Sequence, residues 1–133
     1  MNQPVRPSTI ASPAAMYELA MTVPAGSECL FSAGIVGVRP DGSIATDIGA
    51  QATEVWKSIG EILTAAGYAP GDVVSYTTYA VAGDDLSEVM AARDRFFSGH
   101  RAASTLITVP SLARPEWKVE VAVIAARQPG AVH

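Results

Sequence analysis

A single acidic side chain interrupts an apolar segment near the end of the chain. Glu120 occupies the middle of Trp117–Ala125, where most neighbours are valine, alanine or isoleucine. A carboxylate in apolar surroundings is costly unless it is paired, exposed or used in a reaction. Two interpretations stay open: Glu120 is a general acid or base, or it is a strand residue that faces water or pairs with Lys118.

Other side chains capable of chemistry give weaker patterns. Cys29 and His100 could act as nucleophile and base, but a lone cysteine in an apolar strand is usually an inert core residue. The two histidines of the chain have no metal-ligand companions at useful spacing, so we predict no metal site. Gly34, Gly37 and Gly42 lie in a predicted hairpin and do not join a strand to a helix, as a dinucleotide-binding fingerprint requires.

The strands that must position Glu120 are predicted from short apolar, β-compatible runs. The run at 72–81 is dense in valine, threonine and tyrosine and has few charges on either face, which indicates a central strand. The predicted strands are 16–23, 29–38, a short one through Ile44, 72–81, 104–109 and 117–125.

The clearest periodicity in the chain is helical. Apolar residues between Ile48 and Ala66 recur at alternating steps of three and four, which predicts an amphipathic helix. Thr46 or Asp47 is a suitable N-cap residue, and Gly67 suits the left-handed conformation that often ends a helix.

The order of the elements indicates the fold class. A second helix is predicted from Asp84 to the residue before Gly99, with a solvated face at 93–95. Three strands, a helix, a strand, a helix and two strands suit an α+β domain in which two helices cover one face of a mixed sheet. Because the last two strands are apolar on both faces, the bare face should be buried against another copy of the chain. We therefore predict a homo-oligomer.

Length and composition restrict the function. The 133 residues suit one domain, 1–133, with flexible tails at 1–15 and 127–133. A net charge of −4 without any basic cluster disfavours nucleic acid as a partner, and no apolar run is long enough to span a membrane. A single cysteine and a start without a signal-like apolar run predict a cytoplasmic protein.

Several segments occur together in the order and spacing typical of one family. From about Pro13 to Ala126 the sequence resembles the Rid family, the YjgF-like (RidA-like) reactive-intermediate deaminases. The resemblance implies a chorismate-mutase-like α+β domain that forms a homotrimer, with ligand clefts between neighbouring subunits and no cofactor. The segments that carry it are Tyr17, Gly34, Ala50-Gln51, 65–67, 71–74 and 119–125.

The resemblance also implies an activity and some of its residues. Rid proteins hydrolyse imines and enamines to 2-keto acids and ammonia. In them an arginine binds the substrate carboxylate through a bidentate pair, and a glutamate in the final strand positions or activates water. Glu120 matches this glutamate, and Tyr17 matches a tyrosine near the cleft.

The sequence departs from the family pattern at several site positions. The family arginine directly precedes Ser-Cys or Ser-Thr, whereas Ala103 precedes Ser104-Thr105 here. Ala33 replaces the usual serine before Gly34, and Thr105 stands where cysteine is common. Loss of the arginine removes the main charged contact to a substrate carboxylate.

Two other arginines are candidates for the missing role. Arg101 lies two residues before Ala103, and Arg114 lies in the loop at 110–115, which is longer than in family members that have the arginine. Taken singly, each is better interpreted as a surface residue. Trp117 could form an aromatic cleft wall or belong to the core. The leading hypothesis is a cofactor-independent Rid-like hydrolase or tautomerase acting on an imine, an enamine or a related pathway intermediate. The alternative is a non-catalytic module that binds a small metabolite in the same clefts.

Overall fold

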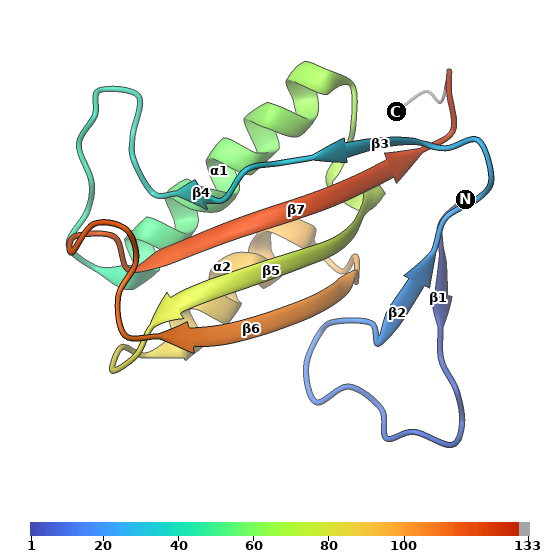
Figure 1. Cartoon of the computed structure of the whole chain (residues 1–133), viewed down its shortest axis with the longest axis horizontal. Helices are drawn as coiled ribbons and strands as arrows, with labels where there is room; N and C mark the ends of the chain where they lie inside the picture. Colours follow the sequence, from blue (N-terminus) through green and yellow to red (C-terminus); the bar gives the residue numbers. More distant parts are fainter. Residues whose placement is uncertain (131–133) are drawn as a thin grey trace.

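Two helices pack behind a mixed β-sheet in the computed structural model, which describes residues 1–130 (Figure 1). A two-stranded sheet contains β1 (Gln3–Val5) and β2 (Ala20–Thr22). The main sheet contains β3 (Glu28–Phe31), β4 (Ile35–Val36), β5 (Val73–Val81), β6 (Ala103–Val109) and β7 (Val119–Arg127). The helices are α1 (Ile48–Ala66) and α2 (Leu86–Phe97), and a 3₁₀ turn, η1, spans Pro70–Asp72.

The strand order of the main sheet is β3-β7-β5-β6, and β4 pairs with β7 beyond the end of β3. β5 and β6 are parallel and joined by α2, whereas β7 is antiparallel to each of its neighbours. Thus β5 has neighbours on both sides, which confirms the predicted central strand at 72–81. The mixed sheet with both helices on one side confirms the predicted α+β class.

The first helix forms as its sequence predicts. The Asp47 carboxylate accepts a hydrogen bond from the Ala50 N–H at 2.9 Å, so Asp47 is the N-cap. Gly67 ends the helix with a φ of 80°, the left-handed region that glycine adopts without steric cost. No helix in residues 1–130 is long and apolar enough to cross a membrane. The buried side chains of the helix are Ile48, Gln51, Ala52, Val55, Trp56, Ile59 and Leu63.

The second helix contains a buried basic residue. Arg93 was expected on a solvated face, but only 8% of it is exposed, so that expectation is wrong. Positions 89, 93 and 97 lie on one helical stripe, and Val89 and Phe97 are both in the core. Asp94 keeps the buried guanidinium paired, with its Oδ1 3.0 Å from the Nε of Arg93.

The early strands are shorter than predicted. The backbone N–H of Tyr17 bonds to the Ala15 carbonyl in a tight turn, so the strand expected at 16–23 is limited to β2. The strand expected at 29–38 divides into β3 and β4, because the Ser32 hydroxyl accepts the Val123 N–H that would otherwise pair with backbone. The short strand through Ile44 is reduced to a single bridge with Val38.

The chain ends also differ from the expected tails. Residues 3–5, expected within a tail at 1–15, form β1 because their backbone pairs with β2. Arg127, expected to begin a tail at 127–133, is the last residue of β7 and pairs with Glu28. Residues 131–133 of that predicted tail lie outside the described residues.

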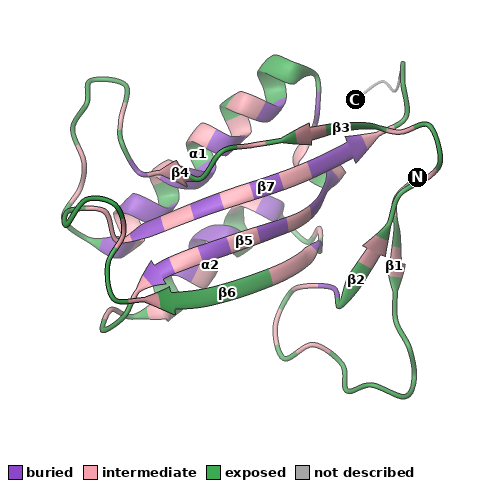
Figure 2. Cartoon of the chain, viewed as in Figure 1, coloured by how far each residue is buried: buried purple, intermediate pink, exposed green. Residues whose placement is uncertain are grey.

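The face of the main sheet opposite the helices, the open face, carries exposed apolar side chains. Buried and partly buried residues alternate along β5 and β7, because one set faces the helices and the other faces outward (Figure 2). Phe31 on β3 is 72% exposed, and Ile107 on β6 is 41% exposed. The prediction that one face of the sheet lacks a helical cover is therefore confirmed.

A fully buried amide joins α1 to the segment that enters β7. The amide Nε2 of Gln51 donates to the carbonyls of Ala45 at 2.7 Å and Glu116 at 2.9 Å. Its Oε1 accepts from the Lys118 N–H at 2.9 Å. One side chain thereby satisfies three backbone groups, two of them on either side of Trp117.

An ion pair between the exposed Arg6 and the buried Glu18 joins the two sides of the N-terminal segment. Glu18 is 4% exposed, and its Oε1 accepts from the Nε of Arg6 at 2.9 Å, while Oε2 accepts from Nη2. The Glu18 N–H also bonds to the Ala102 carbonyl, which ties this segment to the start of β6. The hydrogen bonds from Arg6 hold the pKa of Glu18 below its usual range, and the positive charge of Arg101 acts in the same direction.

We expect Gln51→Leu to lower the free energy of unfolding by about 3 kcal/mol, because each buried backbone group left unpaired costs about 1–3 kcal/mol. Urea unfolding measures this loss. Thr53→Ala on the same helix is the matched control, since the Thr53 hydroxyl is exposed: it donates to the Gly49 carbonyl and accepts a long, exposed bond from Arg95. Equal stability of the two variants would contradict the role of Gln51.

We expect the stabilising effect of Glu18 to depend on pH. Its pKa is lowered in the folded chain and is about 4.3 in the unfolded chain, so the stabilisation is complete above about pH 4.3 and is lost as the pH falls through the folded value. Glu18→Gln should therefore destabilise the protein near neutral pH and have a much smaller effect in strong acid. Urea unfolding over this pH range, with the exposed Glu61→Gln as control, tests this; a difference from wild type that does not change with pH would refute it.

Candidate functional site

Glu120 lies on the open face, at the second position of β7. Its neighbours Val119 and Val121 are buried on the helix side, so the alternation of the strand directs Glu120 outward. The side chain is half-buried, and within residues 1–130 its carboxylate has no hydrogen bond or ion pair. The possible pairing with Lys118 is wrong, because the Lys118 Nζ lies 3.3 Å from the Asp84 carboxylate.

The carboxyl group of Glu120 rests directly on Gly34. A Cβ atom added to Gly34 would lie 2.6 Å from the Cδ of Glu120, and even closer to Oε2, so any larger residue at this position would displace the Glu120 carboxylate. Ala33, the residue before it, is exposed. The structure thus brings together Glu120, Gly34 and Ala33, three residues that the sequence assigned to one site.

Trp117 and Arg114 lie at the same end of β7 as Glu120. The Arg114 guanidinium carbon is 5.5 Å from the centroid of the Trp117 ring, and the Trp117 N–H donates to the Arg114 carbonyl at 3.1 Å. This contact is a cation–π interaction on a loop whose backbone is fixed by Gln51 on either side of Trp117.

Thr105 and Ala103 share the face of Glu120 but lie further along the sheet. Thr105 of β6 pairs with Thr77 of β5, which in turn pairs with Ala122 of β7. Since Ala122 is two residues from Glu120, Thr105 is offset from Glu120 by about 7 Å along the strand direction. Ala103 lies two residues further along β6, so its distance from Glu120 along the strand direction is about 13 Å. Ala103, the position at which the resemblance implies an arginine, therefore faces the same surface as Glu120.

Arg101 and Tyr17 lie at the far end of β6 from Glu120. Arg101 is exposed just before the strand, and its Nη2 lies 3.2 Å from the Met16 Sδ. Tyr17 is half-buried beside Glu18, which pairs with the start of β6. Neither residue reaches Glu120 within one chain.

Two residues at the site carried no assigned role in the sequence. Tyr79 is directly opposite Glu120 in β5 and is partly buried on the open face. Its position alternates with the buried Tyr76, Thr78 and Ala80, and this alternation was the available signal. Gln51 fixes the segment before Glu120, and its signal was a polar residue within the buried stripe of the first helix.

Comparisons with known proteins agree on one family. Residues 9–127 match the family model described as endoribonuclease L-PSP. A 2-iminobutanoate/2-iminopropanoate deaminase from Salmonella typhimurium is 30% identical over 123 residues, which cover 91% of this chain and 96% of that protein. The protein of the same name from Escherichia coli is 29% identical over 124 residues, with 91% and 96% covered.

Solved structures have the same fold. The crystal structure of YyfB from Yersinia pestis, a protein of the Rid family, has a TM-score of 0.85 at 28% identity, covering 95% of this chain and 98% of that one. The YjgF gene product of E. coli has a TM-score of 0.70 at 29% identity, with 88% and 94% covered. The chain described here therefore belongs to the endoribonuclease L-PSP family and, within it, to the Rid proteins.

Proposed function

We propose that the protein is a cofactor-independent hydrolase of imines or enamines and that Glu120 is its acid/base. The observation that carries this proposal is the half-buried Glu120 carboxylate, which rests on Gly34 and lacks a partner among the described side chains. A carboxylate left unpaired on an apolar surface is available for proton transfer. Deaminases that act on 2-iminobutanoate and 2-iminopropanoate are among the relatives of the chain, which supports the same reaction class.

The reaction needs only water and one group that takes and returns a proton. Water adds to the imine carbon while Glu120 accepts a proton from it, and the carbon–oxygen bond forms. The carboxylic acid then returns the proton to nitrogen, which gives a neutral carbinolamine. Glu120 next takes the proton of the new hydroxyl group and delivers it to nitrogen, so that the carbonyl forms as the carbon–nitrogen bond breaks and ammonia leaves. The products are one carbonyl compound and one ammonia for each imine and water consumed, and Glu120 ends as a carboxylate.

We propose that three copies of the chain cover the open faces and enclose Glu120 in clefts between subunits. Phe31 and Ile107 expose apolar surface on the face that contains Glu120, and exposed apolar surface of this kind favours association. In such a cleft Tyr17, Arg101 or Arg114 of a neighbouring copy could contribute to the substrate site, together with Trp117, Thr105 and Ala33.

Substrate charge is the second part of the proposal. Ala103 has no group that binds a carboxylate, although it faces the same surface as Glu120. We propose that imines carrying a carboxylate bind weakly unless Arg101 or Arg114 supplies the contact. A protein that binds a metabolite without converting it is the alternative outcome.

We expect Glu120→Gln to lower the turnover of imines and enamines by about 100-fold or more, because the amide keeps the shape of the side chain but cannot accept the proton. The assay couples a source of imines to detection of the carbonyl product. Sedimentation equilibrium and the melting temperature should be unchanged. A variant with full activity, or one that loses its assembly or fold, would show that Glu120 is structural.

We expect Ala103→Arg to raise kcat/KM for 2-iminobutanoate by about tenfold or more, because a charge-assisted hydrogen bond contributes about 1.5–3 kcal/mol. Ala103→Lys is the matched control, since it adds the same charge without the planar fork that binds a carboxylate at two points. A rate in wild type that already equals that of the arginine variant would show that another group binds the carboxylate. Alanine substitution of Arg101 and of Arg114 would then identify it.

A further inference from the structure

A groove separates the hairpin of β1 and β2 from the turn at 99–101. Its cavity has a volume of about 330 Å³, and its charged lining consists of Arg6, Arg101 and Glu18, with the imidazole of His100 beside them. We call it the basic groove. It lies at the end of the sheet where β6 begins, whereas Glu120 lies where β7 begins, at the opposite end (Figure 1).

The basic groove has more positive than negative charge. One buried carboxylate, that of Glu18, serves the two arginines, and His100 is close enough to act on the same carboxylate. With His100 neutral, the fixed charges in the lining sum to about +1, in a chain whose net charge is −4. The excess is therefore local, and it favours an anion.

Much of the hydrogen-bonding capacity of the two guanidinium groups remains available. Arg6 uses Nε and Nη2 on Glu18, and its side chain is 66% exposed. Arg101 is exposed, and the partner of its Nη2 is the thioether of Met16, a weak acceptor. Oxygen atoms of an anion would satisfy these donors better than sulfur does.

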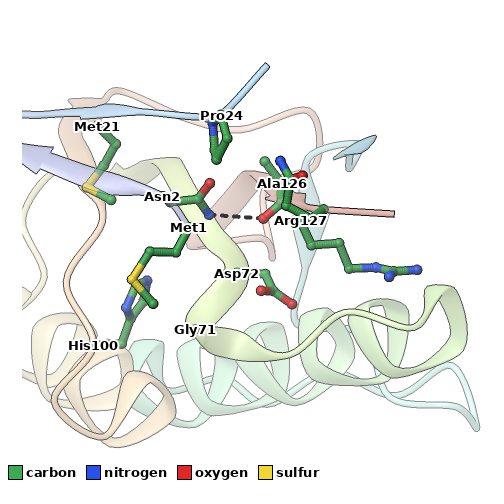
Figure 3. Close-up of a pocket in the computed structure, with 10 residues that line it drawn as sticks. Met1, Asn2, Met21, Pro24, Gly71, Asp72, His100, Ala126 and Arg127 are labelled. Carbon is green, nitrogen blue, oxygen red and sulfur yellow. Dashed lines mark hydrogen bonds between the residues drawn. The ribbon is translucent and has the colours of Figure 1, made fainter. Parts of the chain in front are cut away.

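A second cavity continues from the basic groove. It has a volume of about 430 Å³ and shares Asn2, Met21 and His100 with the groove. Figure 3 shows Met1, Met21 and His100 on one side of this cavity, and the Asn2 side chain is held by a 2.9 Å bond from its Nδ2 to the Ala126 carbonyl. The two spaces together offer room for a molecule larger than a bare inorganic ion.

We propose that the basic groove binds a small organic oxyanion, a carboxylate or a phosphate monoester, between the guanidinium groups of Arg6 and Arg101. Glu18 holds Arg6 in place beneath the ligand, and the body of the ligand extends past His100 into the adjoining cavity. Within one chain this site is far from the proposed acid/base. Ala126 in the adjoining cavity is six residues from Glu120 along β7, or about 20 Å.

The test is a titration of the full-length protein with three probes: succinate, glycerol 3-phosphate and inorganic phosphate. Calorimetry gives the Kd, and amide NMR shifts give the location, at constant ionic strength. We expect saturable binding with shifts at 99–101 and at Arg6. Preference for succinate or for glycerol 3-phosphate separates a carboxylate ligand from a phosphate ester, and inorganic phosphate reports the contribution of the anionic group alone.

Arg101→Gln is the decisive variant, because Arg101 is exposed and its removal leaves the Glu18 pair intact. We expect it to weaken binding by about tenfold or more, the effect of one lost charge-assisted hydrogen bond. Arg95→Gln, which removes the same charge from the exposed surface of α2, is the control and should leave Kd unchanged. Glu120→Gln should also leave Kd unchanged, whatever its effect on turnover. Absence of saturable binding, or equal losses in the Arg101 and Arg95 variants, would overturn the proposal.

Discussion

The position of Glu120 depends on the buried amide of Gln51. This side chain bonds to the backbone on both sides of Trp117 and also to Ala45, so it links the start of α1, the loop before that helix and the entry into β7. Gly37 packs directly on the backbone of Gln51. A side chain would not fit there, because a Cβ at that position would lie 2.7 Å from the Gln51 carbonyl oxygen. A polar residue inside the core thus determines where the final strand begins and which of its residues face outward.

The parts of the fold that were predictable depend on local patterns. α1 shows a regular apolar stripe, an acidic N-cap at Asp47 and a glycine at position 67, and each signal lies within the segment that it describes. The split between β3 and β4 has a different cause, since Ser32 bonds to Val123, 91 residues away. β1 likewise forms only because residues 20–22 pair with it. Contacts of such long range leave no periodicity in the sequence.

The candidate site was predictable to a similar extent. Glu120 was recognisable because a charge among valines is locally anomalous, and the structure places its carboxyl group against Gly34. The offset of Ala103 and Thr105 from Glu120 depends on the strand register, which becomes known only when β5 is placed between β6 and β7. Arg93 shows the same limit, because the charge of a residue does not reveal that the stripe it belongs to is buried.

The two glutamates at opposite ends of the sheet show how environment decides the role of a side chain. Glu18 is almost completely buried, yet hydrogen bonds from Arg6 and the positive charge of Arg101 nearby compensate its desolvation. Its carboxylate is occupied by Arg6, and its backbone N–H bonds to the Ala102 carbonyl just before β6. Glu120 is less buried, and within the described chain it has backbone beneath it but no cation beside it. A carboxylate that is already paired stabilises the fold and has little freedom to accept a proton. Glu120 has no such partner among the described side chains, and for that reason we propose it, and not Glu18, as the acid/base.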